Sequence, residues 1–583
     1  MTTSPQRRLS SDDSFHTAAD SSYAKDTAAS SPVRSPPCPY RDARQLPPEL
    51  KQHCQIYLEE KLFTPAVQLL AANLAAGRSR AASAMAMATT TTRPALVPPA
   101  SHLALINTLT IHPLHTTRAD KPESLEVSAR ALAYLRDVLH AVGPFNADFK
   151  TAFMFHPPAR SGGLGGRSGH FRSNANADNS DVSDGEAEGG EDRLSSVLAN
   201  SASVWQRGQD FWSVVGWAFN CCTLYPKRWK HWLTWLEFMI EVLQADWDER
   251  ERRDAENHEA GGGAPQDAPP ATLRKQSIIC MYMRPENGRQ LSFKHMLKAI
   301  LADGGSVTSS SFREVFDKEQ RGPKKENKKR KRETLDLDND KYGDYFDDDP
   351  MSSGTSEPPT PQKPRDTRKV SFGTSQAGFA ESIPLRLRLF KLLSLAVFTL
   401  ENAEVFSLYE DLTSSLLVLP LHSFFLITSQ RPGDLVLDAH ITLTKLLLER
   451  LVPSTRKNPR RVDKQGEDEG RLTSPMLEHC YAVHPANTVA LEDNAKLSLV
   501  VEKALLLLWQ CDALDVTASF REAVEKGVAA REAKARKKRT TGKARNPDGT
   551  DDVALDMLVD SGERIRALLD TLESFTVEEA SAS

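Results

Sequence analysis

Hydrophobic positions recur at helical spacing in several separate stretches of this chain. Between residues 124 and 144, leucines and alanines are three or four residues apart, which places them on one face of an amphipathic helix. The alternation typical of strands is rare, and no Asn-Gly pair separates two apolar runs. The pattern therefore predicts an all-α protein, in which helical hairpins pack as an irregular bundle or an α-solenoid and are interrupted by long disordered inserts.

Polar, low-complexity stretches divide these helices into predicted blocks. Such stretches bury too little apolar surface to offset the entropy lost on ordering. We expect helical blocks at residues 46–156, 192–300 (rich in Trp) and 380–520. We expect a disordered tail at 1–45, a disordered insert at 157–191, a disordered regulatory strip at 301–379, and a basic stretch with a terminal amphipathic helix at 521–583.

Tryptophans gather in the predicted central block. Seven of the eight lie there: Trp205, Trp212, Trp217, Trp229, Trp232, Trp235 and Trp247. Tyr225-Pro226 separates two helices, and we expect this hairpin to be a packing centre. The run Leu-Tyr-Pro-x-x-Trp-x-x-Trp from Leu224 to Trp232 resembles helical-repeat proteins of the tetratricopeptide and half-tetratricopeptide kind. That resemblance covers one hairpin, no fixed-period repeat appears elsewhere, and no function is carried over from it.

Composition limits the cellular setting. The seven cysteines are widely spaced, and the first residues contain no apolar leader segment. The most apolar stretch, Leu385–Leu400, contains Arg386, Arg388 and Lys391 and is typical of a buried helix rather than a membrane span. We expect a soluble protein of a reducing compartment with no membrane partner. The net charge of −4 argues against a basic field over the whole chain.

Catalytic and metal-binding patterns are weak. The glycine-rich loop near Gly162 lacks the lysine of a phosphate-binding loop. Asp336, Asp338 and Asp340 have the spacing of a calcium loop, but Lys341 stands where the turn requires glycine. We predict no catalytic, cofactor-binding or metal-binding residues, no cofactor, and a protein that is not an enzyme. A catalytic triad assembled from residues far apart in the chain is left open.

Two dense basic clusters indicate nuclear import. Their alternative interpretation is a solvated run of charges. Direct contact with nucleic acid is a weaker inference, because the acidic run 336–349 would oppose a phosphate backbone and no aromatic residues are interleaved. The predicted import residues, which an import receptor would bind, are Lys324, Lys325, Lys328, Lys329, Arg330, Lys331, Arg332, Lys537, Lys538 and Arg539.

Predicted phosphorylation sites lie in the polar stretches. Ser4, Ser31 and Thr360 each precede a proline that is followed two positions later by a basic residue, which resembles the full consensus of cyclin-dependent kinases. Phosphorylation would add about −1.5 to −2 charges at each site. Ser371 follows a basic pair and is a plausible target of basophilic kinases.

A short peptide resembles the docking motif of type-1 protein phosphatase regulators. Arg368 and Lys369 are followed by Val370 and Phe372, which would point into adjacent pockets if the peptide added to a sheet edge. A phosphate on Ser371, between these two anchors, would switch docking off. The alternative is an incidental apolar pair in a linker.

Together these patterns predict a nuclear, non-enzymatic helical scaffold or adaptor, which binds other proteins through helical surfaces and is regulated by phosphorylation of its disordered segments. The alternative is a chromatin-associated or nucleic-acid-associated factor, in chromosome maintenance or transcription, that uses the basic clusters directly.

Overall fold

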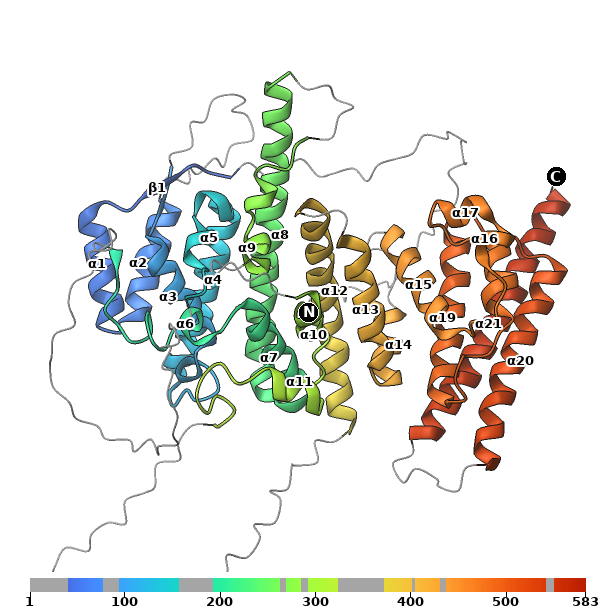
Figure 1. The fold of residues 1–583 in the computed structure, drawn as a ribbon. Coiled ribbons are helices and arrows are strands. Elements are labelled where there is room, and N and C mark those ends of the chain that lie inside the picture. Colours follow the sequence, from blue (N-terminus) through green and yellow to red (C-terminus); the bar gives the residue numbers. More distant parts are fainter. Residues whose placement is uncertain are drawn as a thin grey trace, which may run out of the picture. The chain divides into compact units, whose positions relative to one another are not determined.

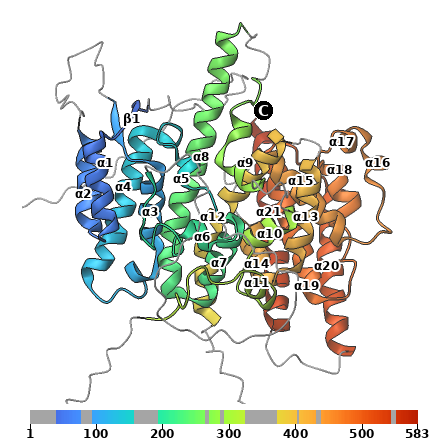
Figure 2. The same cartoon turned by 60° about the vertical axis from the view of Figure 1, so that its left-hand side comes forward.

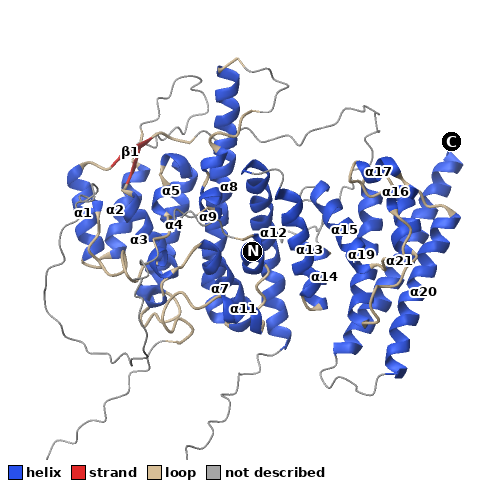
Figure 3. Ribbon diagram, viewed as in Figure 1, coloured by secondary structure: helices blue, strands red, loops and turns tan. Residues whose placement is uncertain are grey.

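Helices form nearly all of the regular structure in the described residues, as the hydrophobic pattern predicted (Figures 1 and 3). The structure is a computed structural model. It describes residues 40–76, 94–156, 192–262, 269–284, 292–322, 372–400, 404–429, 437–541 and 550–582. The described residues from Arg41 onward belong to one compact unit.

The first part of this unit contains two short strands and a set of helices. The elements are β1 (Ala43–Gln45), α1 (Pro48–Glu59), α2 (Phe63–Ala75), β2 (Ala95–Val97), α3 (Ala100–Ile111), η1 (Pro113–His115), α4 (Pro122–Asn146) and α5 (Phe149–Ala152). β1 and β2 pair in parallel, with Ala43 opposite Ala95. The sequence did not predict this pair, because each strand has only three residues, too few to show alternation.

The central part is built around a helical hairpin. Its elements are α6 (Val204–Arg207), α7 (Phe211–Leu224), α8 (Pro226–Ala260), η3 (Arg274–Gln276), α9 (Ile278–Met283), α10 (Phe293–Ile300) and α11 (Ser306–Ser311). α7 and α8 form the hairpin that Tyr225-Pro226 predicted, and Pro226 occupies the first turn of α8, where its missing N–H costs nothing. All seven tryptophans of this part are buried, so the hairpin is the predicted packing centre.

The last part contains the remaining helices. They are α12 (Phe372–Leu400), α13 (Val405–Val418), α14 (Leu421–Thr428), α15 (Leu437–Leu451), α16 (Pro459–Val462), α17 (Lys464–Asp468), α18 (Ser474–Met476), the π-helix η5 (Leu477–Ala482), α19 (Leu491–Gln510), α20 (Ala518–Thr541) and α21 (Thr550–Ala582). α12 packs against both α7 and α8, and α19 packs against α15, α20 and α21 (Figures 1 and 2). None of the helices among the described residues is long and apolar enough to cross a membrane.

Three boundaries differ from the sequence-based expectations. The sequence pattern predicts a linker at residues 251–270, but α8 continues to Ala260, because ion pairs such as Arg253–Glu249 and Arg252–Glu256 support its charged end. Residues 301–322 were expected to be disordered, but they include α11 and the buried side chains of Phe312 and Phe316. α12 begins at residue 372 rather than near 380.

Cationic side chains bind the last carbonyl groups of several helices. Those carbonyls have no partner within their own helix and carry the negative end of the helix dipole, so a cation there is favourable. The pairs are Arg41 with α2, Arg228 with α3, Arg386 with α10, Lys496 with the end of α13 and Arg531 with η5. Segments distant in sequence are joined in this way.

Candidate functional site

Most of the predicted site residues lie outside the described residues. These are Ser4, Ser31, Thr360, the cluster from Lys324 to Arg332, and Arg368, Lys369, Val370 and Ser371. Phe372 is the first residue of α12, and Lys537, Lys538 and Arg539 belong to the end of α20. The structure therefore shows where the motif-bearing residues 323–371, hereafter the 323–371 segment, are attached.

The two flanks of the 323–371 segment bind consecutive residues of α8. The preceding flank, which ends at Gly322, reaches Arg228 through Glu319. The following flank, the start of α12, reaches Trp229 through Glu381. Both attachments lie in the first turn of α8, beside the Tyr225-Pro226 turn.

The first attachment is a fully buried ion pair. Arg228 Nη2 is 2.6 Å from Glu319 Oε2, and the two side chains are 1% and 0% exposed. Arg228 Nε donates a second bond to the same carboxylate oxygen at 2.8 Å. Removing one partner of such a pair leaves a charge buried without compensation, which is strongly destabilising.

Further hydrogen bonds complete this attachment. Arg228 Nη1 donates to Thr116 Oγ1 at 2.8 Å, and Nη2 donates to the Ile111 carbonyl at 2.7 Å. The backbone N–H of Val315 donates to Glu319 Oε1, and Thr117 Oγ1 donates to the Glu319 carbonyl. The flank is thereby joined to α8 and to the residues after η1.

Two opposing effects act on the pKa of the buried Glu319 carboxyl group. Burial raises the pKa of Glu319, whereas the positive charge of Arg228 and its hydrogen bonds lower it. The guanidinium of Arg228 also lies 5.1 Å from the Trp232 ring centre and 5.9 Å from that of Phe316, within the range of a cation–π interaction. These aromatic rings help to stabilise the buried cation.

The second attachment joins α12 to α7 and α8. Trp229 Nε1 donates to Glu381 Oε2 at 2.7 Å. One turn earlier, Gly378 lies so close to α7 that an added Cβ would be 2.1 Å from the Cys222 carbonyl oxygen. Only glycine fits between these two backbones.

Arg386 fixes the next turn of α12. It is fully buried, and it donates to the carbonyls of Ile300 and Ala302, to Ser382 Oγ, and to Cys222 Sγ. Burial lowers the pKa of Arg386. Its guanidinium lies 4.0 Å from the Phe219 ring centre and 4.5 Å from that of Phe379. Arg386 thus joins α12, α10 and α7. None of its hydrogen-bond partners among the described residues is a carboxylate.

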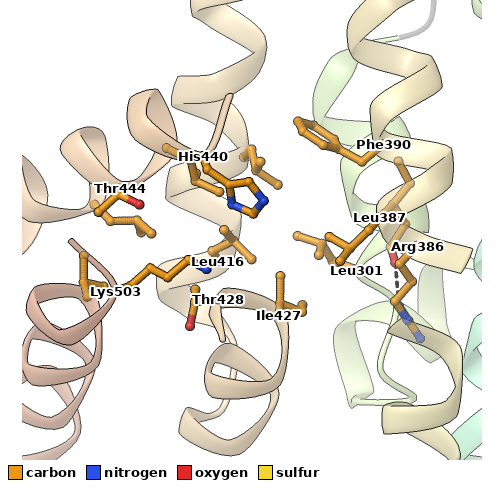
Figure 4. A pocket seen from close by; sticks show the side chains of 15 residues that line it. Leu301, Arg386, Leu387, Phe390, Leu416, Ile427, Thr428, His440, Thr444 and Lys503 are labelled. Atoms are coloured by element: carbon orange, nitrogen blue, oxygen red, sulfur yellow. Dashed lines mark hydrogen bonds between the residues drawn. The ribbon is translucent and has the colours of Figure 1, made fainter. Parts of the chain in front are cut away.

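A small apolar cavity lies beyond Arg386, between α12, α13, α14, α15 and α19 (Figure 4). Its volume is about 40 Å³, room for a few water molecules rather than for a cofactor. Leu416, Ile427 and Phe390 line it, and His440 points into it. Figure 4 shows that the guanidinium of Arg386 points away from this cavity.

A larger, more polar hollow of about 460 Å³ lies between α3, α5 and residues 192–206. Ser101, Asn200 and the opposite charges of Asp192 and Arg193 line it. No group of three or more His, Cys, Asp or Glu side chains within the described ranges has the arrangement of a metal site. No known protein family, curated protein or solved structure matches the chain.

Sequence reasoning missed the residues that make the attachments. Arg228 lies in the quoted Trp-rich run and Arg386 in an apolar helix, so both stood out as charges among apolar residues. Glu319 lies in a stretch with the polar composition of a linker, and nothing near it in the sequence indicates that its side chain is buried.

Proposed function

We propose that this protein is a nuclear helical scaffold that holds a regulated, partner-binding segment at a fixed place. The observation that carries the proposal is the attachment of both flanks of the 323–371 segment to adjacent residues, Arg228 and Trp229. The segment carries a basic cluster, a proline-directed site at Thr360 and, with Phe372 directly after it, the residues that resemble a phosphatase-docking peptide. An adaptor needs a rigid body and a recognisable peptide, and this chain combines the two.

The contacts made by the buried charged side chains support a scaffold role. Arg228, Glu319 and Arg386 are the kind of buried ionisable group that an active site could use. Here each of them binds helix ends or flanking backbone. Their described contacts explain how the helices are held together.

Nuclear import by the basic clusters is tested by localisation in cells. Neutralising Lys328, Lys329, Arg330, Lys331 and Arg332 together with Lys537, Lys538 and Arg539 should leave a tagged full-length protein in the cytoplasm. Lys227 and Lys230 are exposed on α8, and their replacement by glutamine provides a control that should stay nuclear. Undiminished nuclear signal after neutralisation would contradict the proposal.

Phosphatase docking is tested by direct binding of the full-length protein to the type-1 catalytic subunit. Val370→Ala combined with Phe372→Ala should abolish binding, because both apolar anchors are lost. Phosphorylated Ser371 should have the same effect. Phe398→Ala is a matched control, since Phe398 is an exposed phenylalanine of the same helix, α12. Equal binding by the parent and the double variant would refute this part of the proposal.

A further inference from the structure

The first turn of α12 overlaps residues 368–372, which resemble a phosphatase-docking peptide. α12 begins at Phe372, so its first residue is the second apolar anchor of that peptide. A peptide that adds to a sheet edge is extended, and only then do side chains two residues apart, such as those of Val370 and Phe372, point to the same side. In a helix, neighbours on one face are three or four residues apart. Phe372 therefore cannot belong to α12 and to a docked strand at the same time.

The contacts that hold α12 in place begin after this first turn. Gly378 lies against the backbone of α7, and the next residue, Phe379, is only 3% exposed. Glu381 then accepts the hydrogen bond from Trp229. Residues 372–377 can therefore unwind without breaking any of these contacts.

The residues of the first turn are poor helix formers. Gly373, Thr374 and Ser375 directly follow Phe372. Replacing one glycine by alanine shifts a helix–coil equilibrium about fivefold toward the helix, so Gly373 favours the unwound state. The first N–H groups of a helix also have no carbonyl partner within it. The turn at residues 372–377 should thus open far more easily than the packed part of α12.

Unwinding also changes the reach of the peptide. Six residues span about 9 Å in a helix and about 20 Å when extended, a gain of about 11 Å. The added length can separate the docking residues from the α7–α8 hairpin, which gives a large partner room to bind them.

We infer that the first turn of α12 is a helix–strand switch that controls docking of the type-1 phosphatase. While residues 372–377 are helical, Phe372 is withheld from the catalytic subunit, and when they unwind the peptide binds. The apparent affinity is then the intrinsic affinity multiplied by the unwound fraction. The switch rests on the proposed docking function and adds the conformational step that regulates it.

Phosphorylation of Ser371 acts on the same switch. Ser371 directly precedes α12 in the sequence. A negative group at a helix N-terminus is favourable because of the helix dipole. A phosphate there therefore favours the helical state, in addition to placing charge beside the apolar pockets of the partner.

The test measures binding of the full-length protein to the type-1 catalytic subunit. Gly373→Ala should stabilise the helical turn and weaken binding by about two- to fivefold. Gln376→Pro should prevent the turn, because proline lacks the N–H and clashes with the preceding turn, and should bind more tightly than the parent. Adding Gly373→Ala to Gln376→Pro should then have no further effect. Gly322→Ala on the other flank, where no atom lies within 4 Å of the Cβ position, is the control and should bind as the parent does.

Two results would overturn the switch while leaving docking intact. One is equal binding by the parent and by both single variants. The other is equal weakening by Gly373→Ala with and without Gln376→Pro, which would mean that the alanine acts directly on the docked peptide. If the parent binds no better than the Val370→Ala, Phe372→Ala double variant, the docking proposal itself fails and the switch is refuted with it. Thermal unfolding checks that each variant keeps the fold of the parent.

Discussion

Arg386 lies in an apolar helix and is nevertheless fully buried. Burial of an unpaired charge is costly. At this position the cost is offset by the negative end of α10, where Arg386 donates to the Ile300 carbonyl, and by two aromatic rings. The sequence indicated a buried helix at Leu385–Leu400. It could not indicate the partners, because the carbonyls that Arg386 binds are more than 80 residues away.

His102 provides a prediction at the residue scale. It is fully buried on α3, and neither ring nitrogen has a hydrogen-bond partner among the described residues. Burial lowers its pKa from the ordinary 6.5 to about 4, with smaller and opposing contributions from Asp192, Lys51 and Glu59. Between these two values the unfolded chain binds the proton and the folded protein does not, so stability falls as the pH is lowered through this window.

The expected loss from His102 between pH 7.5 and pH 5 is about 2 kcal/mol of unfolding free energy. His102→Leu removes the titrating group, so its unfolding free energy should fall less than that of the parent, by about this amount. Chemical denaturation at the two pH values measures the difference. Identical pH dependence in the two proteins would show that the folded state binds a proton at His102 as readily as the unfolded chain.

At the element scale, α12 depends on close approach to α7. Alanine is a better helix former than glycine by about 1 kcal/mol, so Gly378→Ala would stabilise an isolated helix. In the folded protein the new Cβ would meet the Cys222 carbonyl, a backbone atom that cannot rotate away. We expect a net loss of about 1 to 3 kcal/mol, as for other overpacked positions.

Thermal unfolding of Gly378→Ala measures this loss. Gly322→Ala is the control, because no atom lies within 4 Å of its Cβ position, and its midpoint should match that of the parent. A Gly378→Ala protein as stable as the parent would mean that α12 does not approach α7 so closely.

The sequence predicted which segments form helices. It predicted less well where the helices end and which helices pack against one another. Apolar spacing and Tyr225-Pro226 indicated the α7–α8 hairpin, and its tryptophans are buried as expected. The charged end of α8 and the start of α12 were missed, since their support comes from ion pairs and from packing against distant helices. Glu319 shows most clearly what the sequence cannot predict. It is a polar residue in a loop, and it is fully buried because it forms an ion pair with Arg228, which is distant in the sequence.

At the scale of the whole molecule, the helices on both sides of the 323–371 segment belong to one packed unit. α12 joins them by packing against α7 and α8, and the attachments at Arg228 and Trp229 fix the two flanks. The two sides should therefore hold together without a covalent link between them. Proteins cut within connecting segments often keep their fold when the contacts lie elsewhere.

The most direct measurement is specific cleavage of the full-length protein at a protease site placed within the 323–371 segment. We predict that the two fragments elute together under native conditions and unfold in one transition, with a midpoint within a few degrees of the uncut protein. Fragments that separate without denaturant, or that unfold independently, would contradict the view that α12 and the α8 attachments join both sides into one scaffold.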